Sequence, residues 1–148
     1  MKKINRGMSL PDEDHVIRHV SSSKLLKDSE GNILGFLAQA FAIRPDETGL
    51  SVNWLEHFEG DHDARTRKSI QELRTVKDIR KKSAFGIANV GKTKEICNKN
   101  KAFVKIVYAP RDGIPSHSEI RQLPSDDLSL QEALATEAFC TLIRNADI

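Results

Sequence analysis

The segment from Asp63 to Lys82 constrains the fold more than any other, because it contains no glycine or proline and carries apolar side chains at a helical spacing. Those side chains recur at every third position: Ile70, Leu73, Val76 and Ile79. The pattern predicts a helix over 63–82, with Gly60 and Asp61 at its start. An amphipathic helix must bury its apolar side, and a β-sheet is the usual surface for that.

Other segments supply the strands of such a sheet. Short runs rich in β-branched residues predict strands, and the predicted strands are 15–20, 50–55, 84–90 and 101–108. Residues 33–43 are apolar, and periodicity does not separate strand from helix there; we favour a strand. Residues 91–100 suit a short helix, and residues 110–124 suit a long loop.

A second helix is predicted near the C-terminus. Ser129 and Glu132 have the spacing of a capping box, and apolar residues repeat every fourth position from Leu130 to Leu142. The predicted fold is an α/β (α+β) domain, with a mixed sheet of about four to five strands covered by two or three helices. We expect one domain over 11–148, preceded by a flexible arm over 1–10.

Composition narrows the class of protein. The chain has 148 residues and a net charge of only +2, but residues 61–105 carry +8 while the segments before and after carry −2 and −4. No apolar run is long enough for a membrane span, and two cysteines are too few for a disulfide framework. We expect a small bacterial-type cytoplasmic domain that binds no resident metal or cofactor.

The basic middle segment suggests the first functional hypothesis. Arg67, Arg74 and Lys81 are spaced by seven, so a helix over 63–82 would align them in one ridge, with Lys77 beside it and Lys82 just beyond. Such a ridge can follow a phosphate backbone or an acidic protein surface. The preferred function is therefore an accessory module that binds nucleic acid or an acidic protein. A larger protein encoded nearby is one partner that would fit this function. Two other interpretations fit the same residues. They could form a solvent-exposed face of the helix, or a surface that packs against the acidic C-terminal segment.

The second hypothesis is a histidine-dependent enzyme that acts on a nucleotide or a phosphodiester. His117 lies in a loop just beyond a predicted strand, where α/β folds often place their chemistry. Together with His15 or Arg18 it could form a site in which histidine transfers a proton and arginine holds an anion. Ser51 and Asn53 share one face of a predicted strand and would line the same cleft.

The third hypothesis comes from residues 86–93, GIANVGKT, which resemble the Walker A loop of the P-loop NTPases. The resemblance implies that Gly86 and Gly91 are the glycines of a phosphate-binding loop, that Lys92 binds the phosphates and that Thr93 is a ligand of Mg²⁺. Mg²⁺ is therefore the cofactor that the resemblance implies. The same residues also fit a strand, a turn and a helix start. The Walker B motif, which holds the metal together with the Walker A loop in that family, does not follow in the remaining chain.

Overall fold

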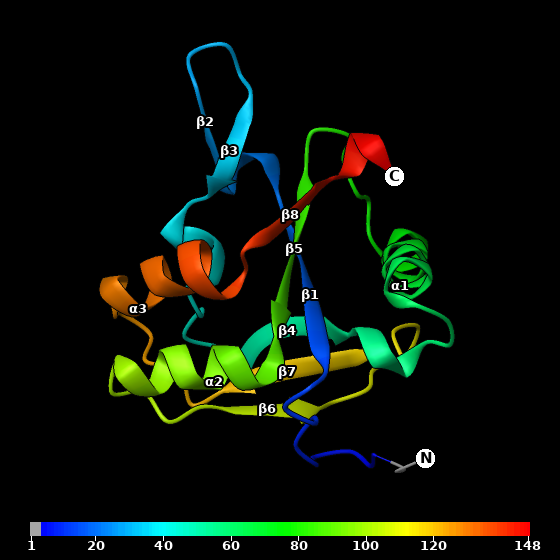
Figure 1. Cartoon of the computed structure of the whole chain (residues 1–148), viewed down its shortest axis with the longest axis vertical. Coiled ribbons are helices and arrows are strands. Elements are labelled where there is room, and N and C mark those ends of the chain that lie inside the picture. The colour runs from blue at the N-terminus through cyan, green and yellow to red at the C-terminus, as the bar shows by residue number, and fades with distance from the viewer. Residues whose placement is uncertain (1–3) are drawn as a thin grey trace.

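A six-stranded antiparallel sheet forms the centre of the computed structural model, which describes residues 4–148 (Figure 1). Its strands are β1 (His15–Val20), β4 (Gly49–Trp54), β5 (Ala84–Asn89), β6 (Lys105–Tyr108), β7 (His117–Arg121) and β8 (Thr141–Arg144). Their order across the sheet is β6-β7-β4-β1-β5-β8, and each neighbouring pair is antiparallel. A separate hairpin of β2 (Leu25–Lys27) and β3 (Ile33–Phe36) projects from one end of the molecule.

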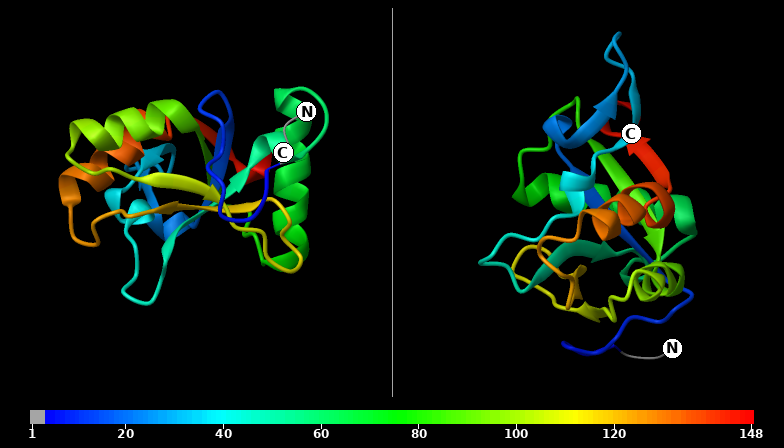
Figure 2. Two further views of the ribbon diagram at one scale, coloured as in Figure 1. Left: turned by 90° about the horizontal axis from the view of Figure 1, so that it is seen from below. Right: turned by 90° about the vertical axis from the view of Figure 1, so that its left-hand side faces the viewer.

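Helices cover both faces of the sheet (Figures 1 and 2). Helix α1 (His62–Val76) packs on one face, where Ile70 and Leu73 join Ile17 and Phe85 in a buried cluster. Helices α2 (Val90–Lys99) and α3 (Leu128–Ala133) pack on the other face, together with the π-helical turn Leu134–Ala138 that extends α3. The protein is therefore an α+β domain in which a sheet lies between helices. The two or three helices that were predicted agree with the observed helices. The observed sheet has six strands instead of the predicted four to five, and it is antiparallel rather than mixed.

Helix α1 ends at Val76, so the helix predicted over 63–82 is wrong beyond that residue. An α-helix turns by roughly 100° per residue, so apolar residues spaced strictly by three drift by roughly 60° at each step. At Val76 the apolar side chains of this series no longer face the sheet, and Val76 is 45% exposed. Lys77 adopts extended backbone angles, and the chain leaves the helix so that Ile79 can pack against the α1-side cluster.

Two strands of the sheet lie where the sequence predicted other structure. Strand β7 replaces part of the loop predicted over 110–124, and its polar residues Ser118 and Glu119 are buried. Strand β8 replaces the end of the predicted C-terminal helix, because the chain reverses after Phe139 and pairs with β5. A pattern based on hydrophobicity misses β7, since Ile120 is its only apolar residue and its other buried side chains are polar.

Two further predictions differ locally from the structure. The segment 33–43, predicted as one strand, contains β3 followed by a 3-10 turn over Ala38–Phe41. Residues 7–10, predicted as part of a flexible arm, run beside β6 through backbone hydrogen bonds, and Leu10 is buried in the core. Part of the predicted arm, residues 1–3, lies outside the described residues.

Candidate functional site

Strands β1 and β4 separate along most of their length, and this opening is the main irregularity of the sheet. They pair only at Val16–Trp54 and Ile17–Asn53, whereas β1 pairs with β5 from His15 to Val20. Two cavities lie along the opening, and both are lined by Arg18, His19, Ser51 and Lys77. We call the two cavities together the β1–β4 cleft.

Arg18 lies at the centre of the β1–β4 cleft. Its Nε donates a hydrogen bond to the carbonyl oxygen of Ala40 at 2.9 Å, and its Nη1 donates to the carbonyl oxygen of Ser51 at 2.6 Å. No carboxylate of residues 4–148 lies within ion-pair distance of this guanidinium. Burial lowers the pKa of Arg18 to about 10, so it remains charged at neutral pH. A positive charge that is partly removed from water and has no acidic partner is unusual, because burial of an unpaired ion is costly.

The larger cavity has a volume of about 400 Å³ and an excess of positive charge. Its charged lining residues are Arg18, Lys24, Arg44, Lys77 and Glu47. The single carboxylate among them, that of Glu47, accepts a hydrogen bond from the backbone N–H of Arg44 at 2.9 Å. The pKa of Lys77 is lowered by burial and by the charges of Arg18 and Lys24. Lys77 therefore lies close enough to Arg18 and Lys24 for the three positive charges to repel one another.

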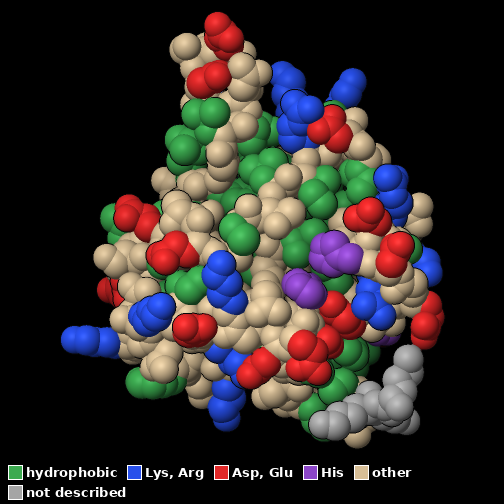
Figure 3. All heavy atoms as spheres, in the orientation of Figure 1, with side chains coloured by type: hydrophobic (Ala, Val, Ile, Leu, Met, Phe, Trp, Pro, Cys, Tyr) green, Lys and Arg blue, Asp and Glu red, His purple; other side chains and the backbone are tan. Residues whose placement is uncertain are grey.

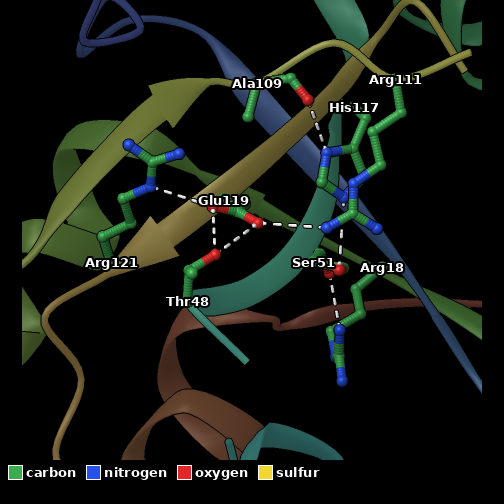
Figure 4. A network of polar contacts seen from close by, with 8 residues as sticks. All are labelled: Arg18, Thr48, Ser51, Ala109, Arg111, His117, Glu119 and Arg121. Atoms are coloured by element: carbon green, nitrogen blue, oxygen red, sulfur yellow. Dashed lines mark hydrogen bonds and ion pairs between the residues drawn. The ribbon is translucent and has the colours of Figure 1, made fainter. Parts of the chain in front are cut away.

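The smaller cavity, of about 260 Å³, contains His117 and the side chain of Ser51 (Figure 4). The register of β4 and β7 pairs Asn53 with His117 and Ser51 with Glu119, which sets His117 diagonally opposite Ser51. The imidazole Nδ1 of His117 lies 2.7 Å from the carbonyl oxygen of Ala109, and its Nε2 lies 3.3 Å from the hydroxyl oxygen of Ser51. Burial lowers the pKa of His117, so the ring is neutral at pH 7.

Glu119 lies two residues after His117 on β7 and lines neither cavity, but it contacts Arg111, which lines the smaller one. It is almost fully buried and pairs with Arg121 at 2.9 Å and with Arg111 at 3.3 Å, while Thr48 donates a hydrogen bond to the same carboxylate (Figure 4). Burial acts to raise the pKa of Glu119, but the hydrogen bonds and positive charges around it outweigh burial and lower the pKa. Glu119 is therefore an anion at neutral pH that holds Arg111 beside the smaller cavity.

His19 contributes a neutral ring to the same cleft. Its Nδ1 lies 3.4 Å from Nζ of Lys77, and its Nε2 is buried without a hydrogen-bond partner among residues 4–148. Burial lowers the pKa of His19 to about 4, and the charges of Lys77 and Arg18 act in the same direction. His19 therefore adds no positive charge to the β1–β4 cleft at neutral pH.

The structure brings together only two of the three residues considered for a catalytic site. His117 and Arg18 both line the smaller cavity, as do Ser51 and Asn53. His15 is not part of it: its Nδ1 pairs with Glu56 at 2.8 Å, and its ring packs edge-on against His62. His15 lines neither cavity. The register of β1, β4 and β7 puts its side chain on the same face of the sheet as that of His117, so its place at the start of β1, and not the face, separates the two histidines.

The residues of the predicted basic ridge are divided between α1 and the segment that follows it. Arg67 and Arg74 are both exposed on α1, and Arg74 donates to the side-chain oxygen of Asn145 at 2.6 Å and to the carbonyl oxygen of Ile148 at 2.8 Å. Lys77 borders the β1–β4 cleft. Lys81 and Lys82 follow the end of α1 and line a separate hollow beside the β2–β3 hairpin. Basic and acidic side chains are interspersed over the face shown in Figure 3.

The segment that resembles a Walker A loop is a strand followed directly by a helix. Gly86 lies inside β5, where it pairs with Arg18 of β1 and Leu142 of β8, and a Cβ atom there would come within 2.8 Å of the Phe36 ring. Packing explains why residue 86 is a glycine, because β5 lies too close to the Phe36 ring to leave room for a side chain at this position.

Helix α2 then starts without an intervening loop. The side chain of Asn89 accepts a hydrogen bond from the backbone N–H of Lys92 at 2.8 Å and caps the helix. Gly91 lies against Asp12, with its N–H bonded to the Asp12 carbonyl oxygen. The hydroxyl of Thr93 is buried and donates to the carbonyl oxygen of Asn89 at 2.7 Å. This geometry is that of the strand-and-helix alternative rather than that of a phosphate-binding loop.

No family model, curated protein or solved structure matches this chain. Among residues 4–148 no helix is both long and apolar enough to cross a membrane. The same residues contain no group of three or more histidine, cysteine, aspartate or glutamate side chains placed to hold a metal ion. The function must therefore be inferred from the β1–β4 cleft itself.

Sequence reasoning missed several residues that line the β1–β4 cleft. Lys24, Arg44 and Glu47 come from connections around the hairpin and before β4, where charged residues are ordinary. Arg18 carries the one local signal, because it interrupts the apolar positions Val16 and Val20 on the same face of β1. A charged residue at an inward position of a strand is a candidate for binding rather than for packing.

Proposed function

We propose that this protein binds a phosphorylated small molecule, such as a nucleotide, in the β1–β4 cleft, with Arg18 holding the phosphate. The observation that carries the proposal is the guanidinium of Arg18, which is charged, partly buried and bonded only to carbonyl oxygens among the described residues. Its Nη2 makes no hydrogen bond within residues 4–148 and remains to bind a ligand. Arginine binds phosphate oxygens with two parallel N–H groups, which makes phosphate a natural partner.

The surrounding charges favour a phosphate monoester over a single carboxylate. Lys24, Arg44 and Lys77 line the same cavity as Arg18, while Glu47 is the single acidic residue there. A doubly charged phosphate would offset this excess better than a carboxylate with one charge. The two cavities, about 400 Å³ and 260 Å³, fall near the size range of small-molecule sites, and their shared residues allow one ligand to extend from one into the other.

Calorimetric titration with inorganic phosphate and with a nucleoside monophosphate tests this proposal. We expect both to bind to the unmodified protein, and we expect Arg18→Met to weaken both at least tenfold, about 1.4 kcal/mol or more. Arg80→Met is the matched control, because Arg80 is exposed in the turn after α1 and outside the cleft. Phosphate binding that survives Arg18→Met unchanged, or no binding at all, would reject the proposal.

A second set of variants covers the case in which Arg18→Met does not fold. Arg44 and Lys77 are exposed at the rim of the β1–β4 cleft, so their replacement leaves the core intact. Arg44→Gln and Lys77→Gln should each weaken phosphate binding severalfold, and the effect should shrink as salt is added. Equal affinities in all three proteins would contradict a site in this cavity.

A second candidate function is contact with nucleic acid or an acidic protein, through a hollow beside the hairpin. This hollow has a volume of about 540 Å³, and its charged lining residues are Lys27, Glu30, Lys81, Lys82 and Arg144. The excess of basic residues supports an acidic partner. Affinity for an oligonucleotide that falls steeply with salt, and falls further on Lys81→Glu with Lys82→Glu, would support it; binding that is absent or indifferent to salt would exclude it.

A further inference from the structure

We propose that Ser51 is a nucleophile activated by His117, and that the β1–β4 cleft breaks a phosphate ester rather than only binding one. The proposal rests on the phosphate binding inferred above and names the chemistry of the same site. Its basis is the geometry of three groups in a row: the Ser51 hydroxyl, the His117 ring and the Ala109 carbonyl (Figure 4).

The hydrogen bond to Ala109 fixes the tautomer of His117. A carbonyl oxygen can only accept, so Nδ1 of His117, 2.7 Å away, must carry the proton. Because the ring is neutral, Nε2 then presents a lone pair, and this atom lies 3.3 Å from Oγ of Ser51. A hydroxyl next to a base whose other nitrogen is held by a third group is the arrangement of an activated nucleophile. Here the third group is a backbone carbonyl in place of a carboxylate.

The position of Ser51 links this arrangement to the anion site. Ser51 lines both cavities, and its carbonyl oxygen accepts a hydrogen bond from Nη1 of Arg18 at 2.6 Å. One residue therefore contacts Arg18 through its backbone and His117 through its hydroxyl. Arg18 and Arg111 line the smaller cavity together with Ser51 and His117, so a phosphate group bound in that cavity would lie between the two arginines and the serine.

The reaction balances in two steps. In the first step Oγ of Ser51 attacks phosphorus, Nε2 of His117 takes the hydroxyl proton, and the bond from phosphorus to the leaving oxygen breaks. The leaving oxygen departs from the opposite side of phosphorus and takes a proton from water, while His117 keeps the serine proton. In the second step a water molecule attacks phosphorus from that opposite side and gives a proton to solvent, the bond to Ser51 breaks, and His117 returns its proton to the serine oxygen. Arg18 and Arg111 offset the negative charge that develops on the phosphate oxygens.

An organofluorophosphonate provides a test that does not require the natural substrate. Attack by Ser51 forms an oxygen–phosphorus bond and expels fluoride, which leaves a stable adduct that mass spectrometry can locate. We expect labelling at Ser51, no labelling of Ser51→Ala at this peptide, and labelling of His117→Asn slowed by about 100-fold. Asparagine retains an N–H that can reach the Ala109 carbonyl and removes the base. Ser118→Ala is the matched control, because Ser118 is a buried serine on the opposite face of β7.

Titration of the same variants with inorganic phosphate separates this inference from the proposed function. Ser51→Ala and His117→Asn should still bind phosphate, which also shows that they fold. Phosphate binding without labelling of Ser51, or labelling that is equally fast in His117→Asn, would overturn the catalytic role and leave the binding site standing. Absence of phosphate binding in the unmodified protein would instead reject the proposed function. If His117→Asn does not fold, Ser51→Ala alone still decides whether the reactive group is Ser51.

Discussion

Arg18 and His117 meet at one residue, although they lie on strands that are not neighbours in the sheet. Arg18 donates to the carbonyl oxygen of Ser51 at 2.6 Å, and His117 approaches the hydroxyl of the same serine at 3.3 Å. Strand β4 lies between β1 and β7, and its residues 49–52 are not paired with β1, which leaves an opening beside Arg18. The open sheet therefore creates the candidate site.

Replacement of Arg18 should weaken the binding of phosphate while it leaves the stability of the unliganded fold almost unchanged. Arg18→Met removes two hydrogen bonds to carbonyl oxygens, but it also removes a charge that has no carboxylate partner among the described residues. The two effects oppose each other, so we expect the free energy of unfolding without ligand to change by less than about 1 kcal/mol. Urea denaturation measures this, and added phosphate should then stabilise the unmodified protein but not the variant. A loss of several kcal/mol would show that Arg18 is mainly structural.

The two cleft histidines should make the protein less stable in mild acid. Burial lowers the pKa of His19 to about 4 in the folded state, against about 6.5 when unfolded, and the pKa of His117 is lowered too. The unfolded chain therefore binds more protons, and the stability contributed above pH 6.5 is lost as the pH falls towards 4. We expect His19 to account for about 1 to 2 kcal/mol of this loss, after allowance for its partial contact with water.

Denaturation at a series of pH values measures this effect, with His19→Gln as the comparison. Glutamine cannot be protonated, so the stability of the variant should fall less steeply between pH 6.5 and 4 than that of the unmodified protein. Parallel curves for the two proteins would contradict the assignment to His19.

Gly86 should tolerate no side chain, for a reason unrelated to phosphate. A Cβ atom at this position would lie 2.8 Å and 2.9 Å from two ring atoms of Phe36, so Gly86→Ala should destabilise the fold by about 1 to 3 kcal/mol. Gly35→Ala is the control, because a Cβ there meets no atom within 4 Å and should change stability by less than about 0.5 kcal/mol. Thermal denaturation compares them. Similar melting temperatures for the two variants would show that Phe36 can move aside.

Arg74 should act as an anchor for the C-terminus rather than as a contact for nucleic acid. It donates to Asn145 and to the carbonyl oxygen of Ile148, so Arg74→Leu should cost about 1 to 2 kcal/mol and speed amide exchange over residues 145–148. Arg67→Leu should leave both quantities unchanged, since Arg67 is exposed and makes no hydrogen bond through its side chain among the described residues. Unchanged exchange in Arg74→Leu would show that the C-terminal turn holds itself in place.

The sequence by itself determined the elements that have a clear hydrophobic period. The patterns of β1, β4 and β5 follow from local burial, and each strand was predicted within one residue of its observed bounds. Strand β6 occupies the second half of the strand predicted over 101–108, and the apolar residues in the first part of α1 lie in the predicted helix. The α+β class follows from them, because amphipathic helices and half-buried strands need each other's apolar faces. The sequence also nominated Arg18, His117, Ser51 and Asn53 as residues of one cleft.

Only the tertiary structure decided the rest. Three buried side chains of β7 are polar and have partners outside the strand, such as Ala109 and Arg111, and β8 pairs with the edge of β5. These contacts are not local, so the local pattern does not indicate either strand. The same long-range contacts decide that Arg74 bonds the C-terminus and that His15 lies away from His117. Pairing across a sheet brings together residues that are far apart in the chain. The opening of the sheet between β1 and β4 places Arg18 and Ser51 at the same two cavities.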